Sequence, residues 1–267
     1  MNRIQQRLNE LSESNKKALI SYVVAGDPDQ KTTLSVMHEL VSSGSDILEL
    51  GVPFSDPSAE GPVIQRAHER ALGNHTSMGQ VLAAVSDFRK TNEQTPIVVM
   101  GYANPIEWMG YRKFCEAAVE AGVDGILVVD LPPEEASEIN SVLTEYGLYN
   151  VFLLAPTTTE SRIKEICKFA SGFLYYVSLK GVTGSGALDV ESVEQKVADI
   201  RKHTSLPICV GFGIKDADTA AAVSSVADGV VVGSAFVDLL ATDDDKTAAQ
   251  SAVGMLARSM RTAIDNS

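Results

Sequence analysis

Cysteine and tryptophan are scarce in this chain: its 267 residues include three Cys and one Trp, and aromatic residues make up only 6%. The thiols Cys115, Cys167 and Cys209 are odd in number and far apart, so the sequence offers neither a disulfide framework nor a cysteine-based zinc site. Cys209 stands in the apolar run 206–210 and is predicted to be a buried thiol. Free thiols are typical of a reducing cytoplasm.

Positive charge is also in short supply. Lys and Arg number 22 against 35 Asp and Glu, so the net charge is −13. This balance argues against nucleic acid or a membrane surface as a partner, because both are anionic. It leaves a phosphorylated substrate open, since backbone N–H groups and a helix N-terminus can hold a phosphate without a cation.

Long apolar runs are missing as well. No stretch approaches the length of a membrane-spanning helix. The first seventeen residues are polar and charged and do not resemble a secretory signal. We therefore expect a cytoplasmic protein that does not contact membranes.

The four histidines, His38, His68, His75 and His203, form no cluster with the spacing of metal ligands. We interpret them as surface or helix-packing residues and expect no metal site. No glycine fingerprint for a dinucleotide follows the first predicted strand.

Short apolar runs alternate with longer amphipathic stretches along the whole chain. The apolar runs have no regular polar face, as expected of parallel strands covered by helices. Eight such runs in about 250 residues predict a single-domain (β/α)8 TIM barrel over residues 1–267. The strands are expected at 18–25, 46–50, 96–102, 125–130, 150–155, 173–178, 206–210 and 229–233. Helices are expected between them, for example at 32–43, 112–121, 134–146, 161–170, 192–203 and 217–225.

Extra helices are predicted at both ends of the chain. Ile4, Leu8 and Leu11 recur at helical spacing near the N-terminus, as do Val253, Leu256, Met260 and Ile264 near the C-terminus. We expect these helices to plug or cover the barrel. Within the barrel, segments 45–50, 123–128 and 227–232 each place an Asp just before an apolar strand, which we interpret as one αβ turn used three times.

Glu49 is the clearest candidate for chemistry. Active sites of such barrels lie at the C-terminal ends of the strands. Glu49 stands near the end of the second strand among Ile47, Leu48 and Leu50. Apolar surroundings raise the pKa of a carboxyl group and suit it to proton transfer near neutral pH. The alternative is a structural Glu paired with a buried cation, but no predicted strand carries an obvious basic partner.

The loop after that strand, 51–62, adds Asp56 and Glu60. Two carboxylates at one pocket can divide acid and base roles. From composition alone, solvated loop acids are the better interpretation of these two residues.

Glycine-rich segments follow the last three predicted strands, at 181–186, 211–213 and 233–234. Glycine is common in any turn, yet loops seven and eight of a barrel, with a helix N-terminus nearby, commonly bind phosphate. Their placement predicts a phosphate site. Tyr22, Tyr175 and Phe212 are candidates for an aromatic-binding pocket, or for ordinary core residues.

Several of these segments resemble one family. Residues 48–57, Leu-Glu-Leu-Gly-Val-Pro-Phe-Ser-Asp-Pro, followed by Gly-Pro-Val-Ile-Gln at 61–65, are similar to the signature of tryptophan synthase alpha subunits. Further segments appear in that family's order, and the resemblance covers essentially the whole chain. They are 22–28, 100–105, 130–132, 181–184 and 211–214.

The resemblance implies a lyase that splits indole-3-glycerol phosphate into indole and glyceraldehyde 3-phosphate in tryptophan biosynthesis. Glu49 matches the main catalytic acid and base, and Glu60 stands where a second carboxylate hydrogen-bonds the indole N–H. Thr183 matches a loop that closes over the substrate. The indole pocket corresponds to Tyr22, Ile64, Met100, Tyr175 and Phe212, and the phosphate site to Gly184, Gly213, Gly233 and Ser234.

Three positions depart from the family pattern. Position 60 is usually Asp, and Glu60 keeps the charge on a side chain one methylene longer. Position 22 is more often Phe and position 100 more often Leu, so Tyr22 and Met100 preserve an apolar pocket.

The resemblance also implies a partner. The expected complex is an αββα heterotetramer with a beta subunit, which holds pyridoxal phosphate, while this chain needs no cofactor. The docking rim corresponds to Pro53, Asp56, Pro57, Asn104 and Pro132.

Two other functions share parts of this pattern. Indole-glycerol-phosphate synthase, or a sugar-phosphate isomerase, would also bind phosphate in a barrel, but that synthase needs lysines on its strands, and the predicted strands carry none. A barrel kept only as a scaffold for the beta subunit would retain the rim and lose the pocket. Glu49 and the glycine loops argue against that interpretation.

Overall fold

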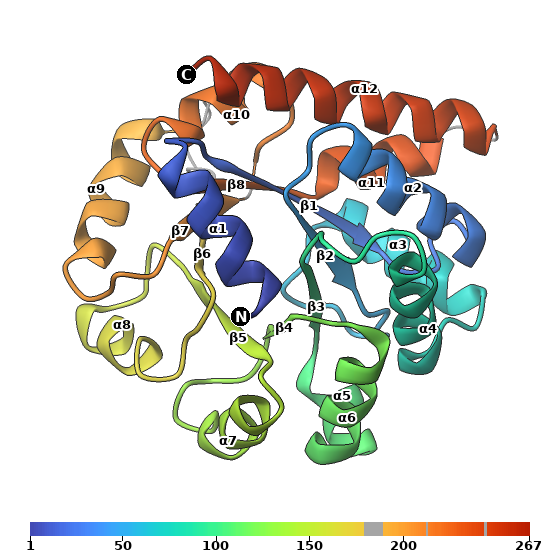
Figure 1. The fold of residues 1–267 in the computed structure, drawn as a ribbon, viewed down its shortest axis with the longest axis horizontal. Helices are drawn as coiled ribbons and strands as arrows, with labels where there is room; N and C mark the ends of the chain where they lie inside the picture. The colour runs from blue at the N-terminus through green and yellow to red at the C-terminus, as the bar shows by residue number, and fades with distance from the viewer. Residues whose placement is uncertain (179–188, 212, 243–244) are drawn as a thin grey trace.

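A computed structural model describes residues 1–178, 189–211, 213–242 and 245–267. Eight parallel strands close into a barrel in chain order, with β8 paired to β1 (Figure 1). This confirms the predicted fold class. The strands are β1 (Ala18–Val24), β2 (Ile47–Gly51), β3 (Ile97–Gly101), β4 (Gly125–Val128), β5 (Tyr149–Leu154), β6 (Leu174–Val177), β7 (Ile208–Gly211) and β8 (Gly229–Val232).

Helices surround the barrel and follow nearly every strand. Each predicted helix is present, with ends that differ by up to four residues. The described helices are α1 (Arg3–Glu13), α2 (Gln30–Ser42), α3 (Pro62–Gly73), α4 (Met78–Arg89), α5 (Ala103–Met109), α6 (Tyr111–Ala121), α7 (Ser137–Glu145), α8 (Glu160–Ile166), α9 (Val190–Arg201), α10 (Ala217–Ser224), α11 (Ser234–Thr242) and α12 (Lys246–Asp265). No helix within these described ranges is long and apolar enough to cross a membrane.

Two predicted elements are shorter than expected for identifiable reasons. The strand predicted over 125–130 ends at Val128, because Asp130 turns away and accepts a hydrogen bond from the N–H of Ala103 at 2.7 Å. The helix predicted over 134–146 starts at Ser137, because residues 133–136 form turns behind Pro132 and Pro133.

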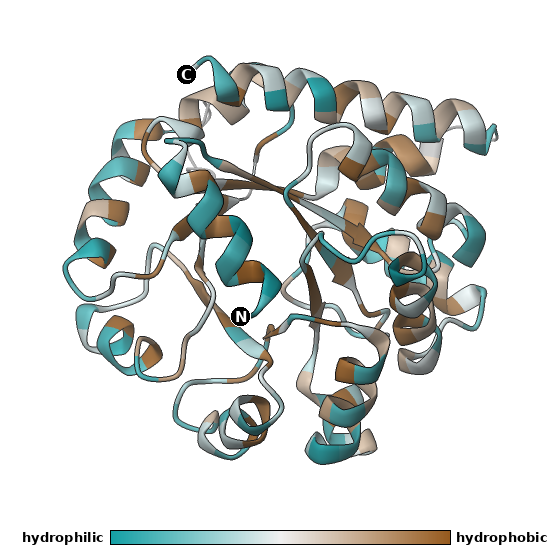
Figure 2. Ribbon diagram, in the orientation of Figure 1, coloured by the Kyte–Doolittle hydropathy of each residue, from teal (hydrophilic) through white to brown (hydrophobic). Residues whose placement is uncertain are grey.

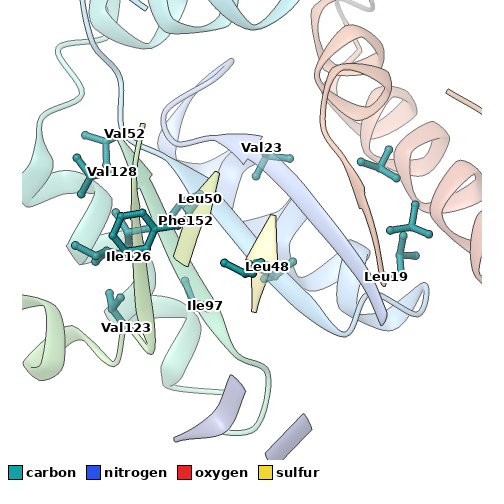
Figure 3. Close-up of a cluster of buried hydrophobic side chains, with 14 of the residues drawn as sticks. Leu19, Val23, Leu48, Leu50, Val52, Ile97, Val123, Ile126, Val128 and Phe152 are labelled. Carbon is teal, nitrogen blue, oxygen red and sulfur yellow. The ribbon is translucent and has the colours of Figure 1, made fainter. Parts of the chain in front are cut away.

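Alternate residues of each strand face the barrel interior and the surrounding helices. In β1, Leu19 and Val23 belong to the outer core between strands and helices, whereas Ala18 and Ile20 belong to the inner one. Figure 3 shows outward-facing residues of β1 to β5 gathered in the outer core. Figure 2 shows the same division, with hydrophobic strands inside a ring of helices whose polar residues face outward.

The first helix plugs the N-terminal end of the barrel, as predicted. Ile4, Leu8 and Leu11 are buried against inward-facing strand residues such as Ile47 and Val98 (Figure 1). Two glycines make room for Ile4, because a Cβ on Gly125 or Gly172 would lie 3.0 Å and 3.3 Å from its side chain. The opposite end of the barrel therefore remains as the place for a pocket.

The last helix, α12, lies outside the barrel against α2, α10 and α11 (Figure 1). It buries Val253, Met260 and Ile264, while Leu256 is only partly buried. This helix covers the barrel wall, so it confirms the prediction that the terminal helices plug or cover the barrel.

The three recurring aspartates perform one structural task. Asp46, Asp124 and Asp228 each precede a strand, and each carboxylate accepts the N–H of a residue near the start of the previous strand at 2.7–2.9 Å. Arginines pair with every one of the three carboxylates. The shared sequence pattern is thus explained by one αβ turn used three times.

Candidate active site

A pocket of about 280 Å³ opens at the C-terminal ends of the strands, opposite α1. Strands β1, β2, β3, β6 and β8 each contribute at least one side chain, and the loops after β2, β7 and β8 close it. The lining residues are Tyr22, Glu49, Glu60, Gly61, Pro62, Val63, Ile64, Met100, Tyr175, Gly213, Ile214, Val231, Gly233 and Ser234.

Glu49 lies on the wall of this pocket and is only 1% exposed. Neither carboxylate oxygen has a hydrogen-bond partner among the described residues, so the sequence-based expectation of a lone carboxyl group holds. Burial, reinforced by the charge of Glu60, raises the pKa of Glu49 to about 8. The group therefore holds a proton at neutral pH and can donate it.

Glu60 reaches the same pocket from the loop between β2 and α3. Burial raises the pKa of Glu60 to about 7, so its carboxylate and acid forms are both available near neutral pH. Asp56, the other acid of this loop, is exposed and hydrogen-bonded to Ser55. The structure thus separates the two loop acids, which composition could not do.

Side chains and ring stacking from neighbouring elements hold this loop in place. Gln65 of α3 donates through Nε2 to the backbone oxygen of Glu60 at 2.9 Å. Tyr102, after β3, accepts the N–H of Ala59 at 3.2 Å and stacks its ring on Phe54, with the centroids 4.9 Å apart. The backbone that carries Glu60 is therefore held by groups from α3 and from the segment after β3.

Apolar and aromatic side chains form the rest of the wall around Glu49. Tyr22 on β1 and Glu49 on β2 are register partners. Met100 on β3 pairs with Gly51 on β2. Ile64 comes from the first turn of α3 and Tyr175 from β6. All four residues that the resemblance assigns to an indole pocket and the structure describes therefore line this pocket, and their contact with an indole ring stays a prediction.

The other end of the pocket presents backbone rather than charge. Gly213, with a φ of 78°, and Gly233 line it, and Ser234 opens α11. The first N–H groups of a helix have no partners within the helix and point toward its N-terminus, where an anion can accept them. No lysine or arginine lines the pocket within the described residues. Phosphate binding at Gly213, Gly233 and Ser234 stays a prediction, and this lining is compatible with it.

Some predicted residues cannot be placed. Thr183, Gly184 and Phe212 lie outside the described residues, so their predicted roles rest on the sequence.

The predicted docking residues lie at the same end of the barrel as the pocket, in the segments after β2, β3 and β4. Asp56 and Asn104 are exposed, and Pro57 and Pro132 are half-buried. Pro53 is buried beside Val52. In the free chain Pro53 therefore shapes the loop and is not part of its open surface.

Sequence reasoning missed some of the pocket. It did not assign Val63, Ile214 or Val231, which carry no chemical signal. His68, interpreted from the sequence as a surface or helix-packing histidine, is a buried residue of α3, so the helix-packing alternative holds. Its contact with Tyr22, whose oxygen lies 3.4 Å from Nε2, was not predicted. The spacing Ile64–His68, one helical turn, was the signal that could have placed it near the pocket.

The described ranges contain no group of three or more His, Cys, Asp or Glu residues arranged to hold a metal ion. Cys115 and Cys209 are buried free thiols, and Cys167 is a partly buried one. The buried state predicted for Cys209 is confirmed.

Comparison with known proteins agrees with this geometry. The family model described as tryptophan synthase alpha chain matches residues 8–265. The tryptophan synthase alpha chain of Thioalkalivibrio sulfidiphilus is 56% identical over 99% of this chain and 100% of its own length. That of Marinobacter nauticus is also 56% identical, over 100% of this chain and 99% of its own length. The crystal structure of the alpha subunit from Legionella pneumophila superposes with a TM-score of 0.94 at 48% identity, covering both chains completely.

Proposed function

This chain belongs to the tryptophan synthase alpha chain family, and from that premise we propose that Glu49 and Glu60 carry its reaction. The family's enzymes are lyases that cleave indole-3-glycerol phosphate to indole and glyceraldehyde 3-phosphate in tryptophan biosynthesis. The observation that carries our proposal is the buried, unpaired carboxyl group of Glu49, which faces the same pocket as the carboxyl group of Glu60.

The steps follow from the protonation states. Glu49 gives its proton to C3 of the indole ring, and the ring becomes an electron-poor indolenine. The bond between C3 and the side chain then breaks, and its electron pair returns to the ring. Glu49, now a carboxylate, takes the proton of the hydroxyl on the departing carbon, which becomes the aldehyde. Glu49 thus ends as it began, acting as acid and then as base.

Glu60 stabilises the intermediate. As a carboxylate it accepts a hydrogen bond from the ring N–H, and this bond strengthens as the ring becomes positive. The apolar wall of Tyr22, Ile64, Met100 and Tyr175 holds the ring, and Gly213, Gly233 and Ser234 bind the phosphate through backbone N–H groups. We keep Phe212, Gly184 and Thr183 in the ring, phosphate and loop-closure roles that the sequence predicts.

The two alternative functions are less compatible with this site. None of the eight described strands carries a lysine, which an indole-glycerol-phosphate synthase would need. A scaffold without activity would have no reason to keep an unpaired buried carboxyl group, which is costly to fold around.

An alpha chain implies a beta-subunit partner. We propose that the two form an αββα heterotetramer in the cytoplasm, with pyridoxal phosphate bound only by the beta subunit. The rim of Asp56, Pro57, Asn104 and Pro132 would face that partner, with Pro53 supporting the loop from beneath.

The first test is Glu49→Gln. This isosteric change removes the transferable proton and should lower the rate of indole formation from indole-3-glycerol phosphate by at least ~100-fold, while binding of the substrate changes little. The parent enzyme should lose activity below about pH 7, as Glu60 is protonated, and above about pH 8, as Glu49 is ionised. These limits belong to the coupled pair. Near-parental turnover of Glu49→Gln would refute the assignment.

A further inference from the structure

A histidine outside the pocket joins two of its walls. His68 lies on α3, one turn after the pocket residue Ile64, and is 2% exposed. It adjoins the small apolar cluster of Tyr22, Val24, Ala67, Ala71 and Val237. The cleavage steps proposed for Glu49 and Glu60 do not use this side chain.

Both ring nitrogens of His68 have partners. The backbone N–H of Phe54 donates to Nδ1 at 3.0 Å, and the oxygen of Tyr22 lies 3.4 Å from Nε2. A backbone N–H can only donate, so Nδ1 must be unprotonated and the ring hydrogen must sit on Nε2, where it donates to the tyrosine oxygen. Burial lowers the pKa of His68 to about 4, so the ring stays neutral in the range where the carboxyl pair works.

The two partners of His68 belong to different parts of the site. Phe54 is in the loop between β2 and α3, which also carries Glu60. Tyr22 stands beside Glu49 in the register of β1 and β2, and its hydroxyl end lies over Gly51, where even a Cβ would collide with it. One neutral imidazole therefore links the wall beside Glu49 to the loop of Glu60.

One half of this link depends on the hydroxyl group of Tyr22. A Phe at position 22 would offer no oxygen to Nε2 and would leave a buried N–H without a partner. Glu60, longer than the usual Asp, sits on the loop that Nδ1 holds. The tyrosine hydroxyl and the histidine are therefore a matched pair in this chain.

We propose that His68 is a positioning residue for the cleavage reaction: it sets the loop of Glu60 through Phe54 and the ring wall through Tyr22. This inference rests on the proposed roles of Glu49 and Glu60. Its expected signature is an effect on turnover through the Phe54 contact and an effect on substrate binding through the Tyr22 contact.

Two substitutions separate the contacts. In His68→Asn, the amide oxygen takes the place of Nδ1 and still accepts from Phe54, but nothing reaches Tyr22. In His68→Gln, the longer amide reaches Tyr22, but the N–H of Phe54 loses its acceptor. A lost hydrogen bond is worth about a tenfold effect. We expect kcat to fall about tenfold in His68→Gln, and KM to rise with a smaller change of kcat in His68→Asn.

Steady-state indole formation from indole-3-glycerol phosphate, well below the melting temperature, measures this split. His75→Asn is the matched control, because His75 is exposed and its φ of 58° suits Asn. The Tyr22→Phe, His68→Asn double variant should be no worse than the worse single variant, since it removes both partners of one contact. The proposal would be overturned if His68→Asn and His68→Gln changed kcat and KM equally. It would also be overturned if the effects of Tyr22→Phe and His68→Asn simply added in the double variant.

A readout without substrate keeps this test apart from the proposed function. Nitrogen-15 shifts of His68 should show the hydrogen on Nε2 between pH 6 and 8, and the Phe54 amide should exchange faster in His68→Gln than in the parent. A parent that forms no indole but shows both signals would refute the proposed function and leave the link intact. A parent that forms indole with the hydrogen of His68 on Nδ1 would overturn the link alone.

Discussion

At the scale of single residues, Glu49 combines deep burial with the lack of a partner. Its carboxyl is buried without a hydrogen-bond partner in the described part of the chain. Folding raises its pKa from an ordinary 4.5 to about 8, and a shift of this size corresponds to several kcal/mol once the group must ionise. Such a cost is expected where a protein holds a reactive group ready for use.

That cost should be visible in the pH dependence of stability. A carboxyl group whose pKa is raised binds its proton more tightly folded than unfolded, so the parent loses stability as the pH rises from 4.5 to about 8. Glu49→Gln removes this proton. The free energy of unfolding of Glu49→Gln should therefore increase relative to that of the parent as the pH rises through this range. Urea denaturation at pH 5, 6.5 and 8 measures this difference. A gap between the two proteins that stays constant with pH would contradict the raised pKa.

Two substitutions of Glu60 separate the effect of its charge from the effect of its side-chain length. Glu60→Ala removes the charge-assisted hydrogen bond to the ring N–H, worth roughly 1.5–3 kcal/mol of transition-state stabilisation. Glu60→Asp keeps the carboxylate and should lose much less. The indole-forming rates of both variants measure the difference, with the exposed acid Glu69 changed to Ala as the control. If Glu60→Ala matched the parent, Glu60 would be only a loop acid.

At this scale, site residues could be predicted where they differ chemically from their neighbours in the sequence. Glu49 was predictable because a carboxyl group inside an apolar strand is conspicuous. Composition could not separate Glu60 from Asp56, and only the family resemblance assigned the pocket role to Glu60, since the folded loop decides which acid turns inward. The contacts of His68 with Phe54 and Tyr22 were not predictable, because these residues meet it only through tertiary structure.

At the scale of elements, buried aspartates hold the turns that lead into the strands. Asp124 is 3% exposed, accepts the N–H of Ile97 at 2.8 Å, and pairs with Arg3 at 2.9 Å and Arg89 at 2.8 Å. The related Asp228 pairs with the more exposed Arg201. The same turn therefore occurs once with a buried ion pair and once with a more exposed one. The contribution of the ion pair to stability can be compared between the two.

Asp124→Ala should cost about 3–5 kcal/mol of unfolding free energy, because Arg89 is left buried without its partner. Asp228→Ala should cost clearly less, since water can solvate Arg201. Thermal or urea unfolding of both variants provides the comparison. Equal losses would mean that the backbone hydrogen bond, common to both turns, supplies most of the stabilisation.

The elements themselves were largely predictable, because strands and amphipathic helices each have a characteristic hydrophobic period in sequence. The three Asp segments were also interpreted correctly as one turn. The ends of elements were less predictable. The end of β4 depends on a hydrogen bond from Ala103 to Asp130, two residues far apart in the chain.

At the scale of the whole molecule, structure and chemistry occupy opposite ends of one barrel. Ile4, Leu8 and Leu11 seal the N-terminal end, and the pocket opens at the other. Ile4→Ala should destabilise the protein by about 2–5 kcal/mol, since it leaves a cavity between α1 and the strands. The half-exposed Val119, changed to Ala, is the matched control and should have little effect.

Indole formation by Ile4→Ala, assayed well below its melting temperature, should stay close to that of the parent. Unfolding free energy and turnover measured on the same preparation test this separation. A large loss of turnover without a loss of stability would show that the plug communicates with the pocket through the barrel interior.

The closed barrel has a consequence for how the protein fails. Every strand is hydrogen-bonded on both sides, since β8 returns to β1, so the native sheet has no edge that could recruit a strand from another molecule. Aggregation must then wait until the ring breaks. Concentrated solutions should stay clear below the melting temperature, and the rate of precipitation on heating should follow the rate of unfolding, because the opened sheet exposes the first available template.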